Sequence, residues 1–203
     1  MHINDFDELI DLDRRAVVET MQLVCAISPD DLTRPTPCAG WTVDDLLAHM
    51  TGQQIGFAAA ARGHGENLAL WAPSHRPYLE VCVDVLTAFG SSPDVQERGF
   101  ALPEIRDGGP FSAPLAISFH LVDSVVHAWD LAVSIGAAVE LDADVLSAAL
   151  RVAEQVPNGA ERLVPGAAFA PGRDESCRGD LDRILVLLGR DPAAWPAVSP
   201  QTA

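Results

Sequence analysis

Three polar side chains recur along one face of an otherwise apolar stretch of the chain. His120, Asp123 and His127 are spaced i, i+3 and i+7, so in a helix they fall within roughly 60° of one another. The surrounding residues are mostly aliphatic or aromatic, and a helix that is apolar nearly all round is typically buried. A carboxylate buried beside imidazoles needs partners, because an unpaired charge there is costly. A bound metal ion is one solution, and an Asp–His hydrogen bond inside the core is another.

A third imidazole that could complete a metal site comes from an earlier segment. Asp123 and His127 lie one helical turn apart and can share a cation, as carboxylate and imidazole ligands do. His49 follows Asp45 by one turn on a predicted helix, and Thr42 with Asp45 resembles a capping box at its start. If the two helices face each other, the three side chains bind one divalent ion and leave positions open. That pattern is typical of catalytic metal sites, not of structural ones.

Helical periodicity predicts the elements that must position these residues. The predicted helices cover residues 5–27, 43–62, 77–89, 113–135, 142–156 and 180–188. The segments 63–77 and 90–114 are interrupted by glycine and proline and are expected to be loops that shape a binding pocket. We therefore expect an all-α fold and a single domain over residues 1–203. Residues 1–136 would form a four-helix metal-binding bundle, and residues 137–203 a small helical C-terminal extension.

The composition argues against several classes of protein. The 29 acidic residues outnumber the 13 basic ones, all of them arginine, and give a net charge of −16, which disfavours nucleic acids and anionic membranes as partners. Four scattered cysteines without a CxxC pair indicate reduced thiols and no zinc knuckle. The N-terminus lacks the features of a signal peptide, and no apolar run reaches the roughly eighteen residues of a membrane span. We expect a soluble cytoplasmic protein, monomeric or homodimeric, that acts on a small molecule.

Several further residues could assist the site. Asp130 follows His127 by three positions and either orients it as a hydrogen-bond acceptor or is a solvated charge. His120 could be a fourth ligand or a proton shuttle, although we favour a core residue. Cys38 precedes a helix, where the dipole favours a thiolate, but we interpret it as structural, and Trp41 as a packing residue. Three residues of the first long loop could also approach the site, although nothing in the sequence places them: His64, His75 and Arg76.

Two segments resemble the hallmarks of a known family, the mycothiol-dependent maleylpyruvate isomerase-like proteins of actinobacteria, which are DinB/YfiT-like metal-binding bundles. They are residues 36–49 (TPCAGWTVDDLLAH) and 123–132 (DSVVHAWDLA), and residues 187–195 (LLGRDPAAW) resemble the ending of one branch. The resemblance implies a four-helix up-down bundle whose metal is held by one histidine and an acid-x3-His pair, here His49, Asp123 and His127. The isomerase has glutamate where this chain has aspartate, one methylene shorter. We also expect this chain to be too short for the isomerase's separate C-terminal domain, so the substrate does not transfer.

The leading hypothesis is an enzyme that binds one divalent metal ion and uses a small thiol. Zinc suits two imidazoles and a carboxylate, while nickel and iron could replace it. Mycothiol is the thiol that the resemblance implies, with S-transferase or isomerase chemistry on a small electrophile. A hydrolase or lyase that uses metal-activated water needs the same ligands. The same residues are also compatible with a non-catalytic protein that binds a metal or a small molecule, and with a structural bundle that binds no metal.

Overall fold

The computed structural model describes residues 6–90, 93–105, 109–164, 167, 169–174 and 176–195. Within these ranges the chain is mostly helical, and the all-α fold expected from the sequence is confirmed. The α-helices are α1 (Phe6–Cys25), α2 (Val43–Ala61), α3 (Tyr78–Gly90), α4 (Ala113–Ile135), α5 (Ala143–Ala153) and α6 (Asp180–Leu187). Each lies where periodicity predicts a helix, although the start predicted at residue 5 falls outside the described residues. None of the described helices combines the length and apolarity needed to cross a membrane.

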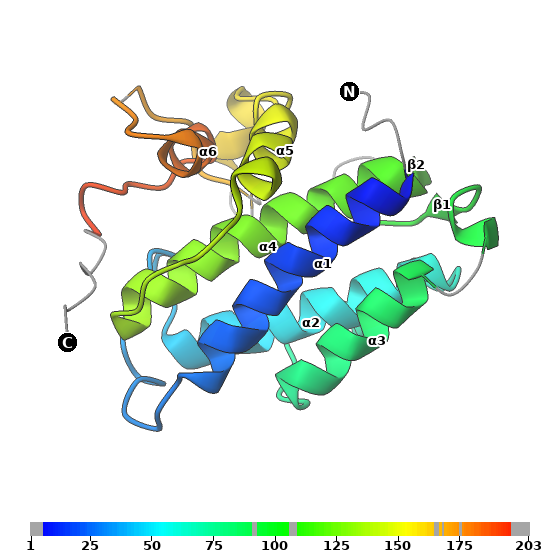
Figure 1. Cartoon of the computed structure of the whole chain (residues 1–203), viewed down its shortest axis with the longest axis horizontal. Coiled ribbons are helices and arrows are strands. Elements are labelled where there is room, and N and C mark those ends of the chain that lie inside the picture. Colours follow the sequence, from blue (N-terminus) through cyan, green and yellow to red (C-terminus); the bar gives the residue numbers. More distant parts are fainter. Residues whose placement is uncertain are drawn as a thin grey trace.

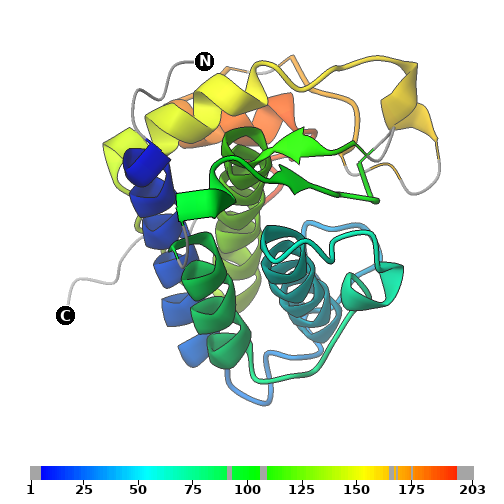
Figure 2. The same cartoon turned by 90° about the vertical axis from the view of Figure 1, so that its right-hand side faces the viewer.

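The first four helices pack side by side as a bundle (Figure 2). Helix α1 packs mainly against α4, and α2 mainly against α3, while α1 also contacts α3 and α2 also contacts α4. Most side chains of α4 are buried, because this helix contacts α1, α2 and α5. Its apolar surface therefore has a neighbour in nearly every direction, which explains why so few of its residues are polar.

The segment 63–77, which the sequence predicts to be a loop, runs back along α2. The Ser74 amide donates a hydrogen bond to the Ala48 carbonyl at 2.9 Å, and Trp71 is buried against Gly56, where even a Cβ atom would collide with the indole ring. Chain direction therefore reverses twice, and α3 runs parallel to α2 (Figure 1). The bundle order is up, down, down, up, and the long connection is what makes two consecutive helices parallel.

Helices α5 and α6 lie together on the α4 side of the bundle (Figure 1). Val145 on α5 and Ile184 on α6 belong to the same apolar cluster as Leu121 on α4. Arg15 on α1 adds ion pairs with Asp142 and Asp144 near the start of α5, at 2.7 and 2.6 Å. The extension thus shares its core with the bundle, which supports the proposal of one domain.

The second predicted loop, residues 90–114, contains a short hairpin among its described residues. Strand β1 (Gly99–Phe100) pairs antiparallel with β2 (Phe111–Ser112), with Gly99 opposite Ser112 and Phe100 opposite Phe111. The Phe100 side chain is buried against Phe89 of α3. The hairpin leads directly into α4 and fixes where that helix begins.

Candidate metal centre

Helix α4 carries three acidic or imidazole side chains on one side. Asp123, His127 and Asp130 are spaced i, i+4 and i+7, which places them along one face. Pro114 lies in the first turn, where its missing N–H is harmless. Gly136 ends the helix with φ of 73°, a conformation that glycine adopts without strain. Because the rest of α4 is packed on all sides, rotation of the helix would expose apolar surface, and the polar face is held in place.

Helix α2 presents His49 to that face. The predicted capping box is present: the Thr42 amide donates to the Asp45 carboxylate, and the Asp45 amide donates to the Thr42 hydroxyl. This start sets the register of the helix, and His49 follows one turn later. Its ring meets the ring of His127 edge-on, with centroids 5.2 Å apart. The structure therefore brings the three predicted ligands together, with one donor atom each of His49, Asp123 and His127 within 4.8 Å of the others.

The distances suit a divalent ion. Two ligand atoms that each lie about 2.0–2.2 Å from a tetrahedral ion are about 3.3–3.6 Å apart. His127 Nε2 and Asp123 Oδ1 are 3.3 Å apart, so this pair needs no rearrangement. His49 has to approach by only a small side-chain movement, since its ligand atom already lies within 4.8 Å of both. Two imidazoles and one carboxylate are a donor set that zinc and its neighbours accept, and the residues fit the group.

Two of the three side chains already have a charge state that suits a cation. Burial, helped by the nearby His127, lowers the pKa of His49 to about 4, so its imidazole is neutral near pH 7 and has a lone pair. Burial alone would raise the pKa of Asp123, but His127 outweighs it, and the pKa falls to about 2. Burial opposes a charge on His127, but Asp123 and Asp130 more than offset it and raise its pKa well above the usual value. The pocket therefore holds an ionised carboxylate and one neutral imidazole, whereas the protonated form of His127 is favoured and has to release its Nε2 proton when a cation binds.

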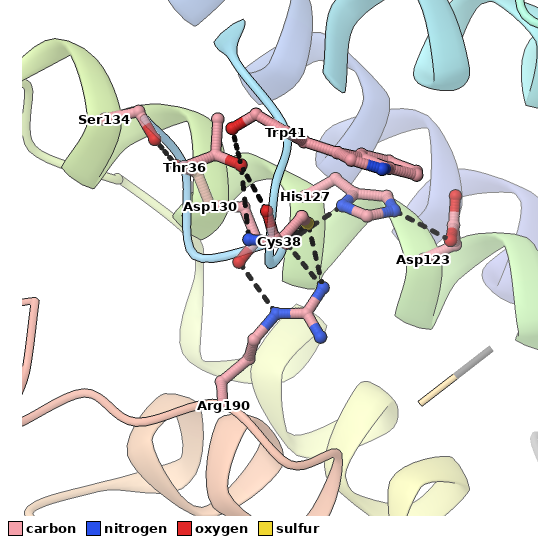
Figure 3. Close-up of polar contacts among 8 residues, drawn as sticks. All are labelled: Thr36, Cys38, Trp41, Asp123, His127, Asp130, Ser134 and Arg190. Carbon is pink, nitrogen blue, oxygen red and sulfur yellow. Dashed lines mark hydrogen bonds and ion pairs between the residues drawn. The ribbon is translucent and has the colours of Figure 1, made fainter. Parts of the chain in front are cut away.

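A second group of possible ligands lies on the other side of His127. Cys38, Asp130 and the Nδ1 atom of His127 are also mutually within 4.8 Å. Here, however, Arg190 already supplies a cation: its Nε and Nη2 donate to the two Asp130 oxygens at 2.9 and 2.8 Å, and Nη2 also lies 3.4 Å from Cys38 Sγ (Figure 3). A metal ion would meet the guanidinium charge at this position. The first group is therefore the better metal site of the two.

The loop before α2 forms a wall of the site. A bridge between Pro35 and Thr42 closes the loop, and the Thr36 hydroxyl donates to the Trp41 carbonyl at 3.0 Å. The Trp41 ring lies 4.9 Å from the His49 ring and is 36% exposed. Trp41 therefore packs against His49, as predicted, but it also faces solvent beside this candidate ligand.

The two accessory residues proposed from the sequence occupy different places. Asp130 is fully buried and accepts a hydrogen bond from His127 Nδ1 at 3.0 Å, so the interpretation as a solvated charge is wrong. His120 is also fully buried, but it lies between Asp13 and Gln54, with its ring nitrogens 2.7 and 3.0 Å from their oxygens. It belongs to neither group of clustered ligands among the described residues, which agrees with a core role.

The loop histidines stay apart from the candidate site. His64 lines a surface depression with Arg62 and Asp84. His75 is exposed, and its Nδ1 lies 3.8 Å from the Asp44 carboxylate. Arg76 is exposed and, like these two, belongs to neither ligand group.

Sequence reasoning misses two features of the site. Arg190 lies in the motif at residues 187–195, which stands out only by its resemblance, and no local signal indicates that its charge reaches Asp130. Cys38 is predicted to be structural, yet its thiol donates to Asp130 at 3.4 Å beside the guanidinium. Its place in the motif at residues 36–49, shared with His49, is the signal that could have found it.

The fold and the site define a DinB-like helical bundle with a candidate metal centre. The family described as "mycothiol maleylpyruvate isomerase N-terminal domain" matches residues 14–132, which span more than half of the chain, and this chain belongs to that family. Two proteins from two strains of Mycobacterium tuberculosis, both described as uncharacterized, are 29% identical to it over 179 residues, covering 83% of this chain and 90% of each relative. No solved structure matches.

Proposed function

We propose that this protein binds one divalent metal ion through His49, Asp123 and His127, and that the preferred ion is zinc. We further propose that it uses the ion with a small thiol of the mycothiol type, in S-transfer or isomerisation of a small electrophile in the cytoplasm. The observation that carries the proposal is the convergence of three ligand atoms from two helices within 4.8 Å. Membership of a mycothiol-related family supports the choice of thiol.

Each residue around the proposed metal ion has a distinct role. A divalent ion bound here would supply a positive charge that lowers the pKa of a bound thiol, so that the thiolate can form near neutral pH. Asp123 offers an ionised carboxylate, and His49 a neutral imidazole that loses no proton on binding. Asp130 holds His127 by its far nitrogen. Three protein ligands would leave room on the ion for a thiol or substrate.

The surroundings of the site indicate the kind of substrate. Trp41 offers a flat apolar surface beside His49, which suits a planar, unsaturated carbon skeleton. The net charge of −16 repels strongly anionic molecules at long range. We therefore propose a small unsaturated electrophile with little net negative charge.

Metal content tests the first half of the proposal. Untagged protein, purified without chelator, is analysed for transition metals beside a His49→Ala, His127→Ala double variant and a His75→Ala control. We expect about one equivalent of metal in the wild type and the control, and none in the double variant. Metal missing from all three, even after incubation with zinc, nickel and iron salts, would contradict the proposal.

Thiol dependence tests the second half. The zinc-loaded protein is given a panel of small unsaturated electrophiles of low net charge, with the dianion maleylpyruvate as the anionic comparison, with and without mycothiol. We expect product only when both thiol and metal are present. Turnover without thiol would favour hydrolysis or elimination by metal-activated water. Stoichiometric binding without product would indicate a binding protein.

A further inference from the structure

We propose that Arg190 is a positioning residue for the metal ligand His127, and that it acts through Asp130. This role rests on the proposed function, because it requires a metal ion at His49, Asp123 and His127. It would make the C-terminal extension part of the metal centre, although neither sequence spacing nor family membership assigns the extension any role there.

The end of α6 aims Arg190 at the bundle. Gly189 has φ of 82°, and its amide donates to Val186, while the Arg190 amide donates to the Leu185 carbonyl at 2.8 Å. This pair of hydrogen bonds is the Schellman arrangement that ends a helix and reverses the chain. Leu185 is itself fully buried in the core. The backbone of Arg190 is therefore anchored beside a packed helix, and its side chain starts from a defined position.

Arg190 controls the orientation of the Asp130 carboxylate. Two parallel hydrogen bonds from Nε and Nη2 hold both oxygens, and the same Oδ2 atom accepts from His127 Nδ1 at 3.0 Å. A bidentate guanidinium fixes the plane of a carboxylate, whereas a single donor leaves it free to turn. Because Asp130 is fully buried, the loss of Arg190 would also leave a carboxylate with too few partners, and the side chain would move or take up a proton.

The orientation of Asp130 decides which nitrogen of His127 faces the metal site. A carboxylate that accepts from Nδ1 keeps a proton on that nitrogen and leaves Nε2, beside Asp123 and His49, as the nitrogen that can bind the metal. Without a fixed acceptor, the ring can rotate or exchange its proton between the two nitrogens. An imidazole that is correctly oriented for only part of the time binds metal more weakly.

A merely structural role is the competing explanation. Arg190 joins the extension to the bundle, and its ion pair with Asp130 could serve only to hold these two parts together. The extension, however, already has other anchors: Ile184 is buried in the shared core, and Arg15 forms ion pairs with Asp142 and Asp144. A structural role predicts a less stable extension with unchanged metal affinity, and a positioning role predicts weaker metal binding by folded protein.

The experiment measures zinc affinity by competition with a chromophoric chelator. The proteins are the wild type, Arg190→Gln, Arg190→Lys and the matched control Arg173→Gln, which removes an ion pair to Asp191 in the same segment. We expect Arg190→Gln to weaken zinc binding roughly tenfold to hundredfold, as outer-shell changes do. Arg190→Lys should lose less, since it keeps the charge but not the two parallel bonds, and the control should match the wild type. Circular dichroism confirms that each variant is folded.

The outcomes separate this role from the proposed function. Folded Arg190 variants that bind zinc as the wild type does would overturn the positioning role and leave the metal site intact. A wild type that binds no metal would overturn both. If neither variant folds, hydrogen exchange of the wild type decides: zinc should slow exchange of the Arg190 amide, because coupling between two sites is reciprocal. Unchanged exchange would overturn the positioning role.

Discussion

Asp123 Oδ1 lies 3.3 Å from His127 Nε2, one turn along α4. This distance suits an ion pair, and it also equals the spacing of two ligands on one tetrahedral ion. The same geometry therefore suits both an ion pair and a bound metal, so metal binding would need no movement of α4. The Asp123 side chain is one methylene shorter than that of glutamate, so its carboxylate oxygen stays close to α4 and to the His127 imidazole.

Replacement of Asp123 tests whether that oxygen is a ligand. Asp123→Asn keeps the shape but removes the negative charge, so zinc affinity should fall by more than the roughly 10–100-fold typical of outer-shell changes. Asp123→Glu keeps the charge but displaces the oxygen by one methylene, and we expect an intermediate loss. Competition titration of both variants measures this. Wild-type affinity in Asp123→Asn would show that the ion lies elsewhere.

Cys38 distinguishes the two groups of possible ligands. If the ion lies between His49, Asp123 and His127, Cys38→Ala should keep the metal stoichiometry of the wild type. Cobalt-loaded wild type should likewise lack the near-ultraviolet absorption of a cobalt–thiolate bond. Loss of metal in Cys38→Ala, or a thiolate band that this variant abolishes, would place the ion beside Asp130 instead.

His120 should affect stability and leave metal binding unchanged. It is fully buried between Asp13 and Gln54. His120→Ala would leave the buried Asp13 carboxylate without its hydrogen-bond partner His120. We expect a loss of about 3 kcal/mol in the free energy of unfolding, measured by urea denaturation. The double variant Asp13→Ala, His120→Ala should lose less than the sum of the single changes, because no charge remains unpaired. Weaker zinc binding by folded His120→Ala would instead make it part of the metal site.

Glu19 should make stability depend on pH in an unusual direction. Burial raises the pKa of this carboxyl above its ordinary value, although its oxygen accepts a hydrogen bond from the Glu140 amide at 2.7 Å. The folded state thus holds the proton more tightly than the unfolded state. The protonated Glu19 carboxyl therefore stabilises the fold at a pH below the pKa that Glu19 has in the unfolded chain. This stabilisation is lost as the pH rises through the pKa that Glu19 has in the folded protein.

Glu19→Gln removes that dependence and can still accept the Glu140 hydrogen bond. We expect the variant to have a higher urea midpoint than the wild type at pH 7, with the difference shrinking towards pH 4. Glu8→Gln on the same helix, at an exposed position, serves as the control. A variant that is less stable than the wild type at pH 7 would mean that the hydrogen bond needs the charge.

The local elements of this protein could be predicted because their causes are local. The apolar run of α4, Gly136 at its end and the capping box of Thr42 and Asp45 each act within a few residues. The i, i+4 spacing of Asp123 and His127 likewise needs only the geometry of one helix. His49 could be grouped with them only on the assumption that the two helices face each other, or through the family resemblance, because its distance from α4 depends on packing.

The sequence by itself therefore determined the helices, the pair of candidate ligands on α4 and the family to which they belong. Only the tertiary structure decided that α3 runs parallel to α2, that Cys38 and Trp41 line the site, and that Arg190 pairs with Asp130. These relationships join residues far apart in the chain, and no periodicity reports them. They follow from how buried surfaces fit together, as when Trp71 packs on Gly56 and turns the chain back along α2, and such a fit depends on all the packed helices at once.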